Sequence, residues 1–257
     1  MTMPSAAISY EPAQRLESAR MLYDLIRSPA DYEVWIERYS SGLLFRLGFG
    51  KTLSHGGENT YLDRVSRTVH VFQRVATMGN YLVDFFPSMM WIPKFLAPFK
   101  RELEQSHLDE RTLFRELLDD IKDQMDKGRA PECWERTVIE KHKEFGLTLD
   151  QGAYIVGNVF EAGSGPSTDA LLWLMRALVV YPDWLKAVQE EVDRTVGDTR
   201  LPDFHDVPKL PTVRAVVKET MRLRPPVGAG IPHQLVKDDV YDGLFFPAGT
   251  VVHANQW

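Results

Sequence analysis

Glu219 and Arg222 have the residue types and the spacing of a helical ion pair. They lie three positions apart in the run "VVKETMRLRPPV", so that a helix would place both side chains on one face. An exposed pair of this kind stabilises a helix by only about 0.3 kcal/mol and by itself indicates no function. Its meaning depends on the segments that surround it.

A second segment with possible chemistry is "FEAGSGPST", residues 160–168, in the most apolar part of the chain. It combines small residues with two hydroxyls, Ser167 and Thr168, and carries Pro166 where a helix should run without interruption. Two interpretations follow. Pro166 either kinks the helix and swings Ser167 inward, or opens a second helical segment with Gly165 as its cap. The run lacks the lysine and the preceding strand of a phosphate-binding loop.

The composition argues against several classes of function. With a net charge of −6 and no basic stripe, the chain does not fit a nucleic-acid-binding protein. The seven histidines show no pair at metal-ligand spacing, and Cys133, the single cysteine, excludes an intrachain disulfide. No stretch reaches the roughly 18 apolar residues that a membrane span needs, and no signal peptide opens the chain.

The elements that must position these residues are mainly helices. Helical patterns with polar joints, ended by glycine or proline, cover residues 12–28, 28–50, 58–80, 113–132, 149–180, 182–197 and 207–227. After them come short β-rich runs, split by turn signals at Asp242-Gly243 and at residues 247–249. The sequence therefore predicts a mostly α fold with a small β-sheet near the C-terminus.

Residues 81–100 interrupt this pattern. They are rich in aromatic residues and contain Pro87, Pro93 and Pro98, which rule out one continuous helix. The segment is either a loop that dips into a membrane or admits substrate, or a loop packed on the protein core.

Taken in order, the interrupted apolar helix, the E-x-x-R helix, the Asp-Gly hairpin and the run "FPAGTVVHANQW" resemble the cytochrome P-450 superfamily of haem-thiolate monooxygenases. The chain is most similar to the microsomal-type enzymes of fungal secondary metabolism, over essentially all 257 residues. The resemblance implies a partial cytochrome P-450 fold, from the D helix to the K helix and first sheet. It also implies that residues 1–257 form a single partial domain, without the N-terminal anchor and first helices and without the C-terminal cysteine-ligand loop.

In that family the central helix is distorted over the haem at a motif [AG]-G-x-[DE]-T-[TS]. Its acid and first threonine deliver protons to the iron-bound oxygen. Ala162 and Gly163 match the haem-facing start of this motif, but the acid position is Gly165 and the threonine position is Pro166. The resemblance therefore leaves Ser167 and Thr168 as the only hydroxyl candidates for the catalytic role.

The resemblance also places the cofactor contacts. The family often has a basic residue after the K helix that pairs with a haem propionate, and here the run is Pro232-His233-Gln234. His233 and Gln234 are therefore haem-pocket candidates, while Glu219 and Arg222 form the structural ion pair. The iron-ligating cysteine of the family lies beyond the K helix. Cys133 lies before the central helix, so we expect no iron ligand in this chain and no haem bound by it alone.

Two functions remain open. The first is a haem-dependent monooxygenase that oxidises an apolar small molecule with electrons from a reductase, inactive in this truncated form. The second is a non-catalytic helical remnant that binds an apolar ligand or a protein partner. The intact E-x-x-R pair favours the first, and Gly165 and Pro166 favour the second. Full-length relatives sit on the endoplasmic reticulum membrane. This chain shows no anchor, and we expect it to be cytoplasmic or peripheral.

Overall fold

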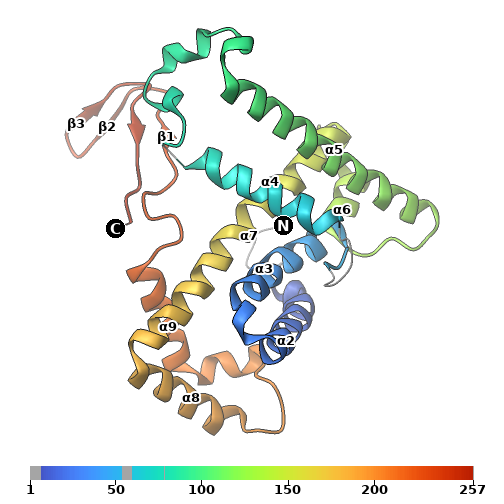
Figure 1. Cartoon of the computed structure of the whole chain (residues 1–257), viewed down its shortest axis with the longest axis vertical. Coiled ribbons are helices and arrows are strands. Elements are labelled where there is room, and N and C mark those ends of the chain that lie inside the picture. The colour runs from blue at the N-terminus through green and yellow to red at the C-terminus, as the bar shows by residue number, and fades with distance from the viewer. Residues whose placement is uncertain (1–6, 54–59, 78, 257) are drawn as a thin grey trace. The chain divides into compact units, whose positions relative to one another are not determined.

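A computed structural model of the chain describes residues 7–53, 60–77 and 79–256, and these are mostly helical, as predicted (Figure 1). The α-helices are α2 (Glu11–Arg27), α3 (Tyr32–Phe49), α4 (Thr60–Ala76), α5 (Pro98–Asp126), α6 (Trp134–Lys141), α7 (Leu149–Val180), α8 (Pro182–Val196) and α9 (Pro211–Leu223). Short 3₁₀ turns join them: η1 (Ile8–Tyr10), η2 (Pro29–Asp31), η3 (Leu82–Asp84), η4 (Pro87–Trp91), η5 (Lys94–Leu96) and η6 (Phe204–Lys209).

The helix boundaries follow local signals. α3 ends as predicted at Gly50, whose φ of 63° is easily adopted by glycine and whose N–H donates to the Arg46 carbonyl at 2.8 Å. α5 begins at Pro98, ahead of the helical pattern at residues 113–132, because a proline in the first turn has no N–H to leave unpaired. α4 confirms most of the helix predicted over 58–80; positions 58, 59 and 78 lie outside the described residues.

The proline-rich segment 81–100 is not a continuous helix, in agreement with the sequence. It forms the three turns η3, η4 and η5 before α5 begins. Its apolar side chains are exposed: Leu82 by 65%, Trp91 by 90% and Phe95 by 73%. These values contradict the interpretation of a loop packed on the core.

By their internal contacts the residues divide into two compact units, one up to Thr168 and one from Asp169 onward. The single partial domain over residues 1–257 therefore stays a prediction. The core of the first unit brings aromatic and aliphatic side chains from α3, α5, α6 and α7 together. Its members include Phe45, Phe49, Phe114, Leu117, Trp134, Val156 and Phe160.

Two glycines allow α7 to pack closely against its neighbours in this core. A Cβ at Gly157 would overlap the ring of Phe114 on α5, and a Cβ at Gly152 would overlap Val138 on α6. Because the rings and side chains here are fully buried, they have no free space into which to move. The glycines of α7 therefore set how closely the helices approach.

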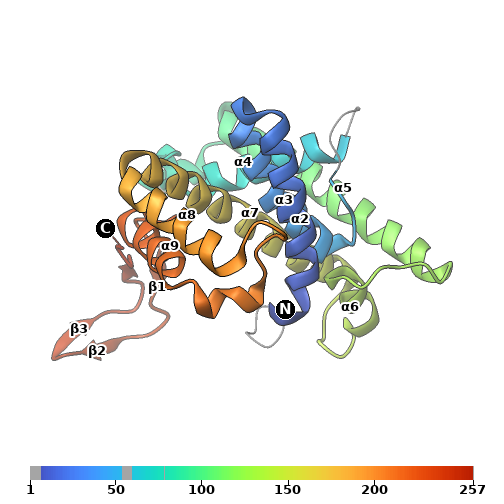
Figure 2. The same cartoon turned by 90° about the horizontal axis from the view of Figure 1, so that it is seen from below.

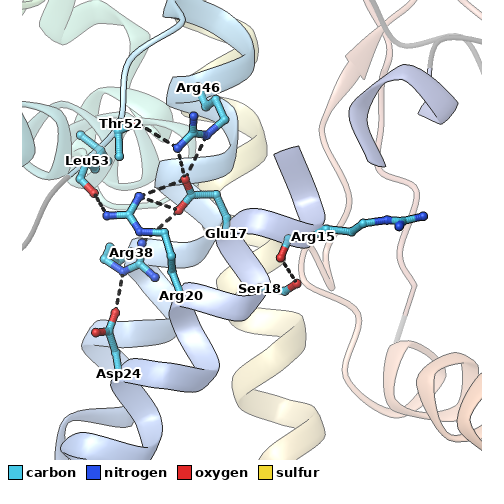
Figure 3. Close-up of polar contacts among 9 residues, drawn as sticks. All are labelled: Arg15, Glu17, Ser18, Arg20, Asp24, Arg38, Arg46, Thr52 and Leu53. Carbon is cyan, nitrogen blue, oxygen red and sulfur yellow. Dashed lines mark hydrogen bonds and ion pairs between the residues drawn. The ribbon is translucent and has the colours of Figure 1, made fainter. Parts of the chain in front are cut away.

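A buried charge cluster joins α2 to α3 (Figure 3). The Glu17 carboxylate is fully buried and accepts hydrogen bonds from Arg38 at 3.0 Å, from Arg46 at 2.8 Å and from Arg20 at 3.2 Å. Arg38 also pairs with Asp24 at 3.3 Å. The cluster fixes the register of the two helices, because a buried carboxylate and a buried guanidinium must stay paired.

The second unit contains the C-terminal part of α7, then α8, α9 and the small sheet predicted near the C-terminus. β1 (His233–Gln234) pairs antiparallel with β4 (Val251–Val252), and β2 (Asp239–Tyr241) with β3 (Leu244–Phe246). The β2–β3 hairpin (Figure 2) turns at Asp242 and Gly243, both with positive φ, as the Asp-Gly signal predicted.

Candidate functional site

Residues 160–168 lie inside one long helix. α7 is assigned as helical from Leu149 to Val180, with Pro166 in its interior. The interpretation in which Pro166 opens a second helical segment is therefore wrong. Pro166 has no N–H and cannot donate to the carbonyl of Ala162, four residues earlier. Ala162 is exposed, so this turn of α7 presents a carbonyl that lacks its helical donor.

The two candidate hydroxyls are bonded within the helix. Ser167 Oγ donates to the Gly163 carbonyl at 3.1 Å, and Thr168 Oγ1 donates to the Ser164 carbonyl at 3.0 Å. Such bonds to the carbonyl four residues back are common for serine and threonine in helices. Ser167 is exposed and Thr168 is half-buried. Ser167 is thus the more accessible of the two to a bound molecule.

The glycines of this segment face other helices. A Cβ at Gly163 would lie 2.8 Å from Leu44 Cδ1 of α3. A Cβ at Gly165, the family's acid position, would overlap Nε2 of Gln73 on α4. The amide of Gln73 therefore fills the place where an acidic side chain would begin. Gln73 was missed by the sequence analysis, because an amphipathic pattern does not tell which residue of another helix meets Gly165.

The predicted ion pair is present on α9. Arg222 donates two hydrogen bonds to the Glu219 carboxylate, at 2.8 and 2.7 Å. These hydrogen bonds lower the pKa of Glu219 and raise that of Arg222. Both side chains are exposed, by 54% and 67%. They border an open groove of about 610 Å³, which Tyr181 and Trp184 also line.

Because the pair is exposed, Glu219→Ala should leave the unfolding midpoint of this chain unchanged within error. Thermal unfolding followed by circular dichroism would check this. A clear loss of stability would mean that the pair is covered in solution rather than open to solvent.

The N-terminus of α9 is capped by another helix. Leu210 at the cap position offers no side-chain acceptor, and Glu191 of α8 takes its place. The Glu191 carboxylate accepts the N–H groups of Thr212 and Val213, both at 3.0 Å. Burial acts to raise the pKa of Glu191, but these hydrogen bonds together lower it. Glu191 therefore holds the start of the helix that carries Glu219 and Arg222.

Glu191→Ala is expected to speed amide hydrogen exchange in the first turn of α9 by about tenfold, because two N–H groups lose their acceptor. The depressed pKa sets the sign of the pH dependence. The cap is intact above the unfolded pKa of Glu191 and is lost as the pH falls through its folded pKa. Exchange measured by mass spectrometry, with the exposed Glu190→Ala as control, checks the expectation. Equal protection in both variants would contradict it.

The other cofactor candidates lie on β1. His233 is exposed, with Nδ1 2.8 Å from the Ile231 carbonyl, and Gln234 Nε2 donates to the Gly249 carbonyl at 3.2 Å. They belong to the second unit, whereas Ala162 and Gly163 belong to the first. Their role at a cofactor stays a prediction.

Cys133 is a buried thiol at the start of α6. Its sulfur accepts the N–H of Arg136 at 3.5 Å, and burial raises its pKa. Across 7–53, 60–77 and 79–256, no cluster of histidine, cysteine and carboxylate side chains could hold a metal ion. No helix within the same residues is long and apolar enough to cross a membrane.

Comparison with known proteins matches nearly the whole chain to a single family. The family model described as Cytochrome P-450 matches residues 4–257. The monooxygenase fogE of Aspergillus ruber is 34% identical over 253 residues, covering 98% of this chain and 47% of that protein. A monooxygenase of Armillaria gallica is 32% identical over 248 residues, covering 96% and 48%. The chain thus spans about half the length of the curated relatives it matches.

The fold has a solved counterpart. A zebrafish cytochrome P-450 structure with abiraterone superposes with a TM-score of 0.75 over 97% of this chain and 56% of that chain, at 22% sequence identity. At this identity the match shows a shared fold, and it confirms that the chain has part of that fold.

Proposed function

The chain belongs to the cytochrome P-450 family, and from this premise we propose that it is part of a haem-dependent monooxygenase that oxidises an apolar small molecule. Haem, when bound, activates dioxygen for that oxidation, and a reductase supplies the electrons. The observation that carries the proposal is the E-x-x-R pair, formed with two hydrogen bonds on a capped helix within a chain that the family model matches over residues 4–257. The resemblance to fungal enzymes supports a place in secondary metabolism.

The described residues fit one face of a haem. Ala162 is small and exposed, and Pro166 follows one turn later on the same side of α7. A helix surface without bulky side chains suits a flat macrocycle. The described residues offer no set of metal ligands, and the sole cysteine is buried at the start of α6. The iron ligand would therefore have to come from a further segment of the protein.

Individual roles follow from this assignment. Ala162 would form the wall against the macrocycle, whereas Gly163 faces Leu44 of α3 and does not belong to that wall. His233 and Gln234 would hydrogen-bond a propionate. Ser167, exposed, could exchange its bond to the Gly163 carbonyl for one to a bound molecule, with Thr168 as a second hydroxyl. Glu219 and Arg222 would hold the structure of the pocket rather than take part in proton transfer.

The exposed side chains of residues 82–96 support contact with a membrane surface. Leu82, Trp91 and Phe95 present apolar surface to solvent, and Lys94 lies among them. Such a segment suits the interface between water and lipid. We therefore place the protein peripherally on the endoplasmic reticulum membrane, the location of its microsomal relatives.

The alternative is a non-catalytic remnant that binds an apolar ligand or a protein. Gly165 and Pro166 favour it, because neither can supply the carboxylate or hydroxyl of the family's motif. The packing of Gln73 against Gly165 favours the monooxygenase, because the amide of Gln73 fills the space that the family's acidic side chain would occupy.

The deciding experiment is to sequence the transcript on both sides of codons 1 and 257. A frame that continues into a glycine-rich loop with a cysteine supports the monooxygenase. The longer product, expressed and reduced, should then show the carbon-monoxide band of a thiolate-ligated haem. A message that stops at both codons favours the remnant.

A further inference from the structure

We propose that Glu161 donates the proton that the family's acid would supply at position 165, and that Glu110 and His107 return protons to it from solvent. This inference rests on the proposed monooxygenase function. It assigns a new role to three residues of the first unit, two on α5 and one on α7, and to none of the motif positions.

Glu161 lies close to position 165, where the family has its acid. It precedes Gly165 by four residues, so both lie on the same face of α7, one turn apart. Its side chain is 1% exposed, and neither carboxyl oxygen has a hydrogen-bond partner of normal geometry among the described residues. A carboxyl in such a place favours its neutral form, which can donate a proton.

α5 supplies a path from Glu161 to solvent. Burial and Glu110 together raise the pKa of Glu161 to about 9. The largest cause is the burial of Glu161, and the second is the negative charge of Glu110, its acidic neighbour on α5. Glu110 lies 3.9 Å from Nδ1 of His107, whose side chain is 58% exposed. The same Nδ1 is 3.2 Å from the Tyr154 hydroxyl, which keeps the imidazole in place.

The charged groups around this path do not neutralise Glu161. Arg111 of α5 pairs with Asp150 at 3.9 Å, and Arg115 holds the same carboxylate at 2.5 Å. Both are therefore engaged at the start of α7. From α4, the neutral amide of Gln73 packs against Gly165, one turn from Glu161.

Polar groups also lead from Glu161 to the exposed face of α7. The Gln73 amide packs against Gly165, and Pro166 leaves the Ala162 carbonyl without its helical donor. An amide and a carbonyl to which Pro166 cannot donate can hold water between the buried carboxyl and this face. Gly165 and Pro166, which remove the family's acid and hydroxyl, thus create a different polar route.

The proton balance of the route is simple. Glu161 gives up one proton toward the exposed face, where the reduction of dioxygen consumes it. The Glu110 carboxylate takes one proton from solvent through His107 and passes it to the resulting Glu161 carboxylate. No electron moves in these steps, and each carboxyl ends as it began.

The first test is an NMR titration of the 257-residue chain with carboxyl-labelled glutamate. We expect a signal with a midpoint of about 9 that disappears in Glu161→Gln. Glu110→Gln should shift this midpoint down by about one unit, because a like charge is removed. The Glu135 signal, expected near pH 8, should stay in place in both variants. A Glu161 already ionised at neutral pH, or one insensitive to Glu110→Gln, would overturn the proposal.

The second test uses the longer product loaded with haem. Glu161→Gln should reduce the product formed per electron pair by about tenfold and increase released hydrogen peroxide, because proton delivery slows. Glu144→Gln, an exposed position on the same unit, should leave this ratio unchanged. A normal carbon-monoxide band with an unchanged ratio in Glu161→Gln overturns the proton route alone. The absence of that band in the unaltered longer product overturns the proposed function, and the proton route with it.

Discussion

Glu17→Ala is expected to lower the free energy of unfolding by about 3 to 5 kcal/mol. The substitution removes the carboxylate on which Arg20, Arg38 and Arg46 converge. Arg38 would be affected most, since its side chain is 1% exposed and it would keep the ion pair with Asp24 but lose the one with Glu17. A buried guanidinium without its carboxylate keeps the cost of desolvation and loses the compensating attraction. Against a typical total of about 5 to 15 kcal/mol, the loss would be large.

Urea unfolding followed by tryptophan fluorescence would measure this change, because Trp134 lies in the core of the same unit. Glu11→Ala is the matched control. Glu11 is on the same helix and pairs with Arg15 at 3.8 Å, but both side chains are partly exposed. We expect the control to change stability by less than about 0.5 kcal/mol. Similar losses in both variants would show that the α2–α3 cluster is not buried in solution.

Glu135→Gln is expected to stabilise the chain by about 2 to 3 kcal/mol at neutral pH. The Glu135 side chain is fully buried, and neither of its carboxyl oxygens has a described hydrogen-bond partner. Burial raises its pKa from 4.5 to about 8, which the charge of Lys122 offsets only in part. At neutral pH the folded state must therefore keep a proton that the unfolded state releases. Glutamine keeps the shape and removes this cost.

The sign of the pH dependence follows from the raised pKa. Below pH 4.5 Glu135 is protonated in both the folded and the unfolded chain, and the folded chain has its full stability. As the pH rises from 4.5 toward about 8, the unfolded chain releases this proton and the free energy of unfolding falls. The difference between Glu135→Gln and the unaltered chain should therefore be small at acid pH and grow through neutrality. Urea unfolding at several pH values would measure it, with the exposed Glu144→Gln as control. A difference that does not change with pH would contradict the prediction.

Much of the fold could be predicted from local patterns. Gly50, Pro98 and the pair Asp242-Gly243 act through their own backbone preferences, so the sequence indicated where elements end or turn. Residues 98–112 of α5, about four turns, were not predicted to be helical. They lack a strong apolar stripe and begin at the last of three prolines. The Glu219–Arg222 pair was equally predictable, since a helix alone brings residues three apart together.

The candidate site was predicted only in part. Pro166 was expected to break or kink the helix, and only the assembled helix shows α7 continuing past it. The hydroxyls of Ser167 and Thr168 were candidates by type, and the structure adds that both bond back to their own helix. Which acceptor a hydroxyl bonds depends on the distances to the carbonyls around it, and a residue pattern does not give those distances.

The sequence by itself determined the family, the helical class, the small C-terminal sheet and the ion pair of α9, because these depend on motif order, periodicity and short-range spacing. Only the tertiary structure decided the contacts between elements: Glu17 among three arginines, Glu191 at the start of α9, Gln73 against Gly165, and Glu161 beside Glu110. The physical reason is that burial and pairing arise when helices distant along the chain meet. In the sequence each of these carboxyls looks like ordinary surface charge. Only the packing of the helices makes one of them a helix cap, pairs another with arginines and keeps a third protonated.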